Sequence, residues 1–314
     1  TDMSKLARNT AFLTVASIGQ KLIAFVYFAL IARIVGVEWT GKYFLALSIT
    51  TMIGVVADFG LTPVLVRETA KRPEDQQSIL SHVLGLKLGL SALAATLVVI
   101  ASYALGYDEL TRSLMYVAIG VMILDSLHLT YYGVFRGRHT LGVESIGIFV
   151  GQFVTLVIGA TSLLIAPNLV MLIMALLGGS LWNVVFSSAR LRSVGLKPFR
   201  IRMKLAWTRK LLKMALPFAL AAIFVKIYST TDSILLEHFM GSESVGWYSI
   251  AYKLTYAFQF VPMAFVAALY PTLSKLIAEK KTVELEETFN KAMWYMMLVA
   301  VPIVLGIFAV AGEV

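Results

Sequence analysis

The sequence predicts an all-α integral membrane protein, and three observations support this fold class. The chain has 314 residues, of which 59% are hydrophobic and 14% charged, with a mean hydropathy of +0.81. Soluble domains are about 45–50% apolar and about 25% charged. In addition, nine apolar segments are long enough to cross a bilayer, and part of the chain repeats at an offset of 205 residues. We expect two pseudo-symmetric helical bundles around a central cavity, the second of them incomplete.

Each predicted span has the length of a transmembrane helix, which needs about 20 mainly apolar residues. The nine spans cover residues 9–31, 40–61, 82–105, 113–135, 143–165, 168–189, 214–236, 245–270 and 292–314. The first span follows basic residues, as a signal peptide would. It is longer than a typical apolar signal region and more spans follow it, so we expect a retained helix.

The basic residues predict the orientation of these helices. Lys and Arg are concentrated in alternate connections, which places those connections and the N-terminus on the cytoplasmic side of a plasma (inner) membrane. The connection 190–213 is the most basic and contains no acid; its basic residues are Arg190, Arg192, Lys197, Arg200, Arg202, Lys204, Arg209, Lys210 and Lys213. We interpret this segment as a topology determinant that contacts anionic lipid headgroups, and we expect no nucleic-acid partner.

An internal repeat divides the chain into lobes. The following residues recur without a gap 205 positions later: Lys5, Leu6, Ala16, Lys21, Leu30, Gly36, Glu38, Gly41, Tyr43, Ala46 and Thr50. Six spans separate the copies, an even number, so the copies share one orientation about an axis along the membrane normal. We expect an N-lobe of six helices at 1–190, a basic cytoplasmic linker at 191–213 and the first three helices of a C-lobe at 214–314. We also expect the natural polypeptide to continue for at least three helices beyond Val314, and Thr1 and Asp2 to be a cloning remnant before Met3.

Charged residues inside the spans indicate the kind of substrate. Four predicted spans contain a lysine: Lys21, Lys87, Lys226 and Lys253. The acids at membrane depth are Asp58, Asp125 and Asp232, too few to neutralise all four lysines. A charge at the bilayer centre costs roughly 2.5–3.5 kcal/mol, so such residues line cavities or pair with one another. The surplus predicts an anionic substrate. The alternatives are structural ion pairs, and snorkelling to the interface for Lys87 and Lys253.

Seven short motifs recur in a characteristic order and spacing, at 33–43, 58–61, 67–68, 216–217, 228–236, 241–252 and 270–275. Together they resemble the polysaccharide biosynthesis family, which includes the O-antigen-type lipid-linked oligosaccharide flippases of the multidrug/oligosaccharidyl-lipid/polysaccharide exporter superfamily. The resemblance covers about residues 5–280. It implies twelve or more helices in two bundles, and a transporter that flips a polyprenyl-(pyro)phosphate-linked oligosaccharide to the outer leaflet by alternating access. It also implies glycan polymerase or glycosyltransferase partners.

On this interpretation, Lys21 and Lys226 bind the phosphate of the lipid carrier. Lysine is a mobile point charge that accommodates phosphate without a fixed bidentate geometry. At 100° per residue, the hydroxyl side chains of Ser229, Thr230 and Ser233 follow Lys226 on one helical stripe, where they could contact sugar or phosphate oxygens.

The acids on other helical faces are candidates for coupling or gating. Asp232 lies off the lysine stripe, on the same side as Tyr228. Asp125 and His128 are one turn apart, a spacing that suits a proton relay or a sugar site. The alternative for this pair is a satisfied polar cluster between helices. We include Asp58 with this group because it lies at membrane depth.

Two other functions compete with the flippase. A multidrug or cation antiporter of the same superfamily should have an acid-dominated cavity, which the lysine surplus opposes. A membrane-embedded glycosyltransferase should cluster acids or histidines at an aqueous loop, and connections such as 32–39 and 166–167 are too short for this. The sequence has no Gly-rich Lys-Ser/Thr phosphate loop, so we do not expect an ATPase, and we predict no catalytic residue, cofactor or metal site.

Overall fold

A computed structural model of the chain describes residues 3–165, 167–258 and 279–312, together with the isolated positions 262, 265, 269, 273, 276 and 277; side chains are described from residue 16 onward. Its helices are α1 (Met3–Val35), α2 (Val37–Asp58), α3 (Leu61–Lys71), η1 (Pro73–Asp75), α4 (Gln76–Ala104), α5 (Glu109–Gly137), α6 (Leu141–Ile165), α7 (Leu169–Ser193), α8 (Leu205–Ala257) and α10 (Thr282–Val310). Eight helices in this described part are long and apolar enough to cross a membrane. The predicted all-α membrane fold is confirmed.

The internal repeat is visible in the backbone. Gly36, between α1 and α2, has φ 84° and ψ 173°. Its repeat partner Gly241 has φ 80° and ψ 175°, and this non-helical residue separates α8 into the seventh predicted span and the start of the eighth. Glycine adopts a positive φ without steric cost, which explains its presence at both turns. Three parts of the predictions lie outside the described residues: most of 259–270 in the eighth span, most of motif 270–275, and positions 313 and 314 of the last span.

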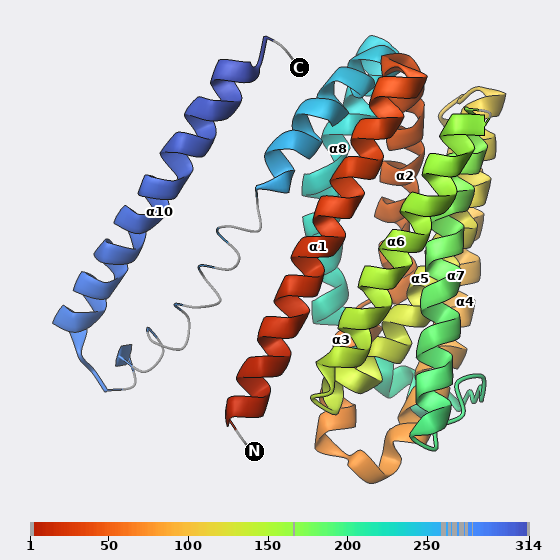
Figure 1. Cartoon of the computed structure of the whole chain (residues 1–314). Helices are drawn as coiled ribbons and strands as arrows, with labels where there is room; N and C mark the ends of the chain where they lie inside the picture. Colours follow the sequence, from red (N-terminus) through yellow and green to blue (C-terminus); the bar gives the residue numbers. More distant parts are fainter. Residues whose placement is uncertain are drawn as a thin grey trace. The chain divides into compact units, whose positions relative to one another are not determined.

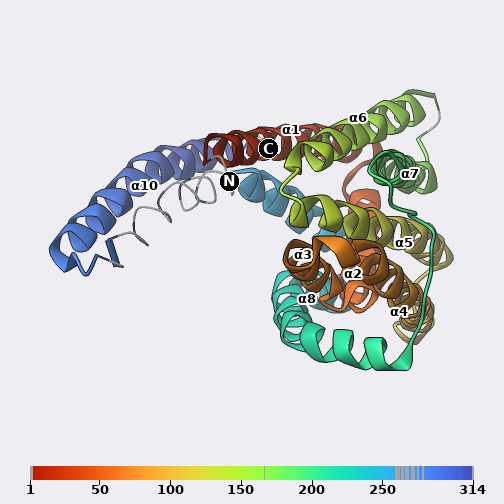
Figure 2. The same ribbon diagram turned by 90° about the horizontal axis from the view of Figure 1, so that it is seen from below.

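The chain forms two compact units, Thr1–Leu254 and Thr255–Val314. The second unit contains α10, which begins earlier than the predicted span 292–314. In the first unit, α6 packs against α1 and α7, while α5 packs against α7, α4, α3 and α2. Figure 1 shows that the α1–α2 connection and the α7–α8 connection lie at opposite ends of this unit. In Figure 2, α7 leads into α8 by a path around the outside of the bundle.

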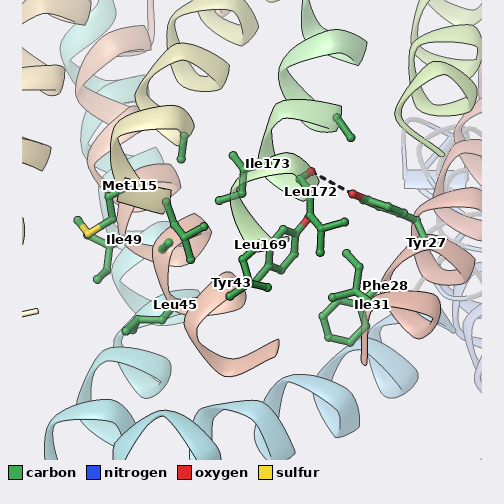
Figure 3. Packing of buried hydrophobic residues seen from close by; sticks show 14 of the residues in the cluster. Tyr27, Phe28, Ile31, Tyr43, Leu45, Ile49, Met115, Leu169, Leu172 and Ile173 are labelled. Atoms are coloured by element: carbon green, nitrogen blue, oxygen red, sulfur yellow. Dashed lines mark hydrogen bonds between the residues drawn. The ribbon is translucent and has the colours of Figure 1, made fainter. Parts of the chain in front are cut away.

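Small residues bring α1, α6 and α7 close together. A side chain at Gly159 of α6 would collide with the ring of Tyr27 on α1. Tyr27 donates a hydrogen bond of 2.9 Å to the carbonyl of Leu172 on α7, within the hydrophobic cluster drawn in Figure 3. Between α6 and α7, an added Cβ at Gly151 would lie 3.1 Å from the Gly179 carbonyl oxygen, and one at Gly179 would lie 2.6 Å from the Gly151 carbonyl oxygen. Small residues at such seams permit the close backbone approach that stabilises helix pairs in lipid.

A helix break connects α2 to α3. Phe59 and Gly60 both have left-handed backbone, with φ 44° and 67°. Gly60 also lies against α8, where an added Cβ would be 2.7 Å from the Ala215 carbonyl oxygen and 2.7 Å from the Ala219 nitrogen. The position therefore requires glycine both for its backbone conformation and for the close approach of a neighbouring helix.

The basic linker is shorter than predicted. Helix α7 continues to Ser193 and α8 begins at Leu205, so only residues 194–204 are irregular. Residues 205–213, expected in the linker, form the first turns of α8. They are helical because the fully buried Leu211 packs into the cluster formed by α3, α4 and α5, together with Trp207 and Leu212.

Candidate functional site

The two repeat-related lysines lie on different helices of the first unit. Lys21 is on α1 and Lys226 on α8, and both are partly exposed. No ion pair or side-chain hydrogen bond reaches the Lys226 ammonium from any residue that the structure describes. An incompletely buried ammonium at membrane depth is suited to an anion or to water.

The hydroxyl stripe beside Lys226 has a defined hydrogen-bond pattern. Ser229 donates 3.3 Å and Thr230 donates 2.6 Å to the backbone carbonyl of Lys226. Ser233 donates 3.3 Å to a carboxylate oxygen of Asp232. These hydroxyl protons are used within the helix. Ser229 is partly exposed and could offer a ligand an acceptor lone pair, whereas Thr230 and Ser233 are buried, at 7% and 2% exposure.

Lys87 does not snorkel, and that prediction is wrong. It is 1% exposed, and its ammonium lies 2.6 Å from Asp58. It also donates 2.9 Å to the Thr62 hydroxyl and 3.2 Å to the Ser126 carbonyl. The side chain faces inward from α4 toward the α2–α3 break, so its charge is neutralised in place. Through Asp58, Thr62 and Ser126, Lys87 thus connects four helices at the break, α2, α3, α4 and α5.

Lys253, which is partly exposed, lies over two aromatic rings. Its ammonium lies 5.5 Å from the ring centroid of Phe28 and 5.7 Å from that of Phe44. Aromatic faces attract a cation electrostatically. The ring of Phe44 in turn lies 6.1 Å from that of Tyr252. Two of the four intramembrane lysines therefore have protein partners that account for their positions.

Asp125 and His128 belong to a polar cluster between α5 and α7. The His128 Nε2 lies 3.0 Å from Asp125 Oδ1, and Ser180 of α7 donates 2.5 Å to the same oxygen. His128 Nδ1 is buried and has no hydrogen-bond partner among the described residues. Asp125 keeps 44% of its side-chain surface exposed, whereas His128 keeps 10%. The carboxylate is therefore accessible while the ring stays enclosed.

Tyr132 extends this cluster along α5. Its hydroxyl donates 2.7 Å to Asn183 Oδ1 on α7, and its ring lies 5.5 Å from that of His128. Sequence reasoning found the α5 residues from their turn-by-turn spacing but missed Ser180 and Asn183. Those two are small or neutral residues on another helix. The signal that could have indicated a polar face there is their spacing of three residues along α7.

Spacing along the helix placed Tyr228 on the same side as Asp232, but the Tyr228 side chain is 89% exposed. The hydrogen bond to Asp232 comes instead from the hydroxyl of Tyr248, beyond the Gly241 turn. This bond connects the two helical halves of α8. Tyr248 is the repeat partner of Tyr43, which the sequence did show.

A pocket of about 780 Å³ lies near the Gly241 turn, between the start of α2, the α4–α5 connection and α8. Its lining includes an ion pair of 2.8 Å between Lys42 and Asp108. Burial raises the pKa of Asp108, but hydrogen bonds from Lys42 and Thr111 outweigh that effect and hold the pKa below its usual value. Burial, with the nearby Glu237 carboxylate, raises the pKa of Tyr107 to about 12.

Comparison with known proteins places the chain in a family. Residues 6–277 match the model of the family described as "Polysaccharide biosynthesis protein". The chain belongs to this polysaccharide biosynthesis family. The resemblance carried by the sequence motifs is thus confirmed.

Two curated relatives of this polysaccharide biosynthesis protein are distant. One is the "Probable low-salt glycan biosynthesis flippase Agl15" of Haloferax volcanii, 21% identical over 98% of this chain and 64% of the relative. The other is the "Capsular polysaccharide biosynthesis protein CapF" of Staphylococcus aureus, 22% identical over 92% of this chain and 71% of the relative. The chain therefore spans less than two thirds of the length of the first relative.

Solved structures show the fold of the family member. An inward-facing multidrug resistance MATE family transporter of the MOP superfamily matches with a TM-score of 0.69 at 15% identity, covering 96% of this chain and 74% of the other. An outward-facing structure described in the same terms matches with a TM-score of 0.61 at 15% identity, covering 96% and 71%. A MOP superfamily transporter from Pyrococcus furiosus, described as having a binding pocket of reverse polarity, matches with a TM-score of 0.62 at 16% identity, covering 98% of this chain and 72% of the other. At such low sequence identity, the structural likeness establishes the fold alone.

Proposed function

We propose that this chain forms part of a flippase that moves a polyprenyl-(pyro)phosphate-linked oligosaccharide from the cytoplasmic to the outer leaflet. The observation that carries the proposal is the matched position of Lys21 and Lys226 in the two repeat copies. Both are partly exposed, and the ammonium of Lys226 has no ion pair among the described residues. The names of the two curated relatives, a glycan flippase and a capsular polysaccharide biosynthesis protein, point to the same class of substrate.

The proposed mechanism assigns the phosphate to the two lysines. An anion between them would offset the cost of keeping two ammonium groups at membrane depth. The oxygen of the partly exposed Ser229 would accept a hydrogen bond from a sugar hydroxyl, because its own proton is already donated within α8. Thr230 and Ser233 are buried and would contact the sugar only in a conformation that opens this helical face. The polyprenyl tail would remain in the lipid, and the carrier would follow as the lobes alternate access.

The acids serve coupling and gating in this proposal. Asp232 and Tyr248 would make and break their hydrogen bond as the two halves of α8 move relative to each other. The Asp125 and His128 cluster would exchange a proton, because its carboxylate is accessible and its ring nitrogen is available. Asp58, held by Lys87, would stabilise the α2–α3 break. None of these steps requires a cofactor or a covalent intermediate, so we propose a transporter rather than an enzyme.

The orientation and partners are also proposals. The basic α7–α8 connection favours a cytoplasmic location, with the N-terminus on the same side and the Gly36 and Gly241 turns outside. A flippase of this class would receive its substrate from glycosyltransferases and deliver it to a glycan polymerase in the plasma membrane.

The deciding experiment measures binding of a polyprenyl phosphate to the purified chain by native mass spectrometry. We expect Lys21→Ala and Lys226→Ala each to weaken binding by about tenfold or more, since a charge-assisted hydrogen bond contributes roughly 1.5–3 kcal/mol. Arginine at either position should restore binding only in part. The matched control is Lys71→Ala at the exposed end of α3. Unchanged phosphate binding in both lysine variants would refute the proposal, and preferential binding of a lipophilic cation would favour an antiporter.

A further inference from the structure

The connection from α7 to α8, residues 194–204, crosses the outside of the bundle; we call it the strap. It runs past α4 before α8 begins, as the view from below shows (Figure 2). It lies at the ends of α7 and α4, where apolar spans stop. The proposed phosphate site does not use this segment.

Hydrogen bonds hold the strap in one position on the bundle. The Gln77 side chain of α4 donates a hydrogen bond of 3.2 Å to the Lys197 carbonyl. It also accepts one of 2.6 Å from the backbone amide of Lys197. The Arg202 amide donates 3.0 Å to the carbonyl of Ser81. On α5, the Tyr131 hydroxyl donates 3.1 Å to the Pro198 carbonyl. The strap is therefore a fixed surface.

A glycine allows the close contact with α4. An added Cβ at Gly85 would lie 2.7 Å from the Arg202 carbonyl oxygen and 2.8 Å from Met203 Cγ. Just beyond the strap, the ring of Trp207 stacks on that of His82 with centroids 5.1 Å apart. The strap thus packs closely on α4, with part of the Ile201 and Met203 side chains beside Gly85.

Apolar and basic side chains alternate from position 199 of the strap to Leu205, the first residue of α8. The apolar positions are Phe199, Ile201, Met203 and Leu205, with exposures of 59%, 52%, 65% and 86%. The basic positions between them are Arg200, Arg202 and Lys204, which are also exposed. No described residue forms an ion pair with any of the three. In extended backbone successive side chains point to opposite sides, so the alternation over 200–204 produces an apolar edge beside α4, still more than half exposed, and a basic edge on the other side.

We infer that the strap docks into the bilayer interface and binds anionic phospholipid headgroups. Exposed apolar side chains in a row are costly in water, whereas the interface accepts them beside the acyl chains. The basic edge is complementary to lipid phosphates, and clusters of Lys and Arg next to transmembrane helices bind anionic leaflets. The inference applies on either side of the membrane and does not depend on the proposed flippase activity.

A cysteine scan tests this inference directly, because the chain contains no cysteine of its own. Single cysteines at positions 199–205, each carrying an environment-sensitive NBD label, are compared in phosphatidylcholine vesicles with and without phosphatidylglycerol. We expect blue-shifted emission and quenching by nitroxide acyl chains at 199, 201, 203 and 205, enhanced by phosphatidylglycerol. Positions 200, 202 and 204 should remain close to water. The alternation of label environment between odd and even positions is an internal control, because general misfolding would affect all seven positions alike.

A pair of charge variants tests the ionic component. Arg200→Gln with Lys204→Gln should reduce the ratio of docked to undocked label at position 203 by about fivefold for each charge removed. Lys71→Gln with Arg72→Gln removes the same charge from the end of α3 and should leave the ratio unchanged. The inference would be overturned if the NBD emission shift did not alternate between odd and even positions. It would also be overturned if phosphatidylglycerol changed the docked fraction equally in the two double variants. Labels that stay water-exposed in all vesicles would instead favour a soluble acidic protein as the partner.

Discussion

Gly41 of α2 lies directly against the backbone carbonyl of Ser242, at the start of the second half of α8. The relationship is reciprocal, because Gly246 lies against the carbonyl of Val37. Val37 and Ser242 are repeat partners, as are Gly41 and Gly246. The two copies thus meet through one pair of equivalent contacts, as expected for elements related by a two-fold axis.

This contact leaves no space for a side chain, so Gly41→Ala and Gly246→Ala should each destabilise it. The added methyl would meet a backbone carbonyl that cannot rotate away, and overpacking of this kind costs roughly 1–3 kcal/mol. We expect a lower thermal unfolding midpoint in detergent. Gly89→Ala on α4 is the matched control, because an added Cβ there meets nothing within 4 Å. Equal midpoints for Gly41→Ala and Gly89→Ala would contradict the prediction.

The buried Lys87–Asp58 pair should be stabilising only while both partners are present. Lys87→Met leaves a carboxylate at membrane depth without its counter-charge, which should cost roughly 3 kcal/mol of unfolding free energy. Adding Asp58→Asn should restore most of this loss. Denaturant or thermal unfolding of the single and double variants measures the coupling. A double variant as unstable as Lys87→Met would show that the pair acts through packing instead.

The Tyr248–Asp232 hydrogen bond should matter for transport more than for substrate binding. Tyr248→Phe and Asp232→Asn should each reduce flipping in vesicles, while binding of a polyprenyl phosphate stays within a few fold. The reason is that the bond connects the two halves of α8 and leaves Lys226 untouched. Tyr228→Phe is the control, since that side chain is 89% exposed. Loss of binding in Asp232→Asn with normal folding would argue against this division of roles.

The Lys42–Asp108 pair should introduce an acid-sensitive contribution to stability. The pKa of Asp108 is lower in the folded protein than its unfolded value of about 3.9, so its contribution is complete above that value and is lost as pH falls through the folded pKa. Because the pair is partly exposed, the contribution is only roughly 0.2–1 kcal/mol. Unfolding midpoints of the wild type and Lys42→Gln should differ at pH 6 and converge at low pH. A constant difference would contradict the assignment to Asp108.

The proposed orientation predicts the side from which the Gly241 turn is accessible. A cysteine at Ser242 should react with an impermeant maleimide added outside intact cells, because the basic strap at the opposite end favours the cytoplasm. A cysteine at Lys197 should react only after permeabilisation. The reverse pattern would invert the topology.

Much of the molecule could be predicted from local sequence. The membrane class, the helical spans and the family motifs follow from apolar runs and short patterns, because a helix in lipid satisfies its own backbone hydrogen bonds within one segment. The repeat also identified equivalent positions, and Gly36 and Gly241 have the same backbone conformation.

Tertiary structure decided which polar groups meet. Neither the pairing of Lys87 with Asp58 nor that of Asp232 with Tyr248 follows from spacing along a helix, because each depends on how helices are rotated and how a turn returns the chain. Ser180 was missed for the same reason. A stripe of residues shows which side chains share a helical face, but only packing against other helices decides what that face contacts. Lys21 and Lys226 were therefore identifiable as a matched pair from sequence, whereas the partners of Lys87 and Lys253 required the fold.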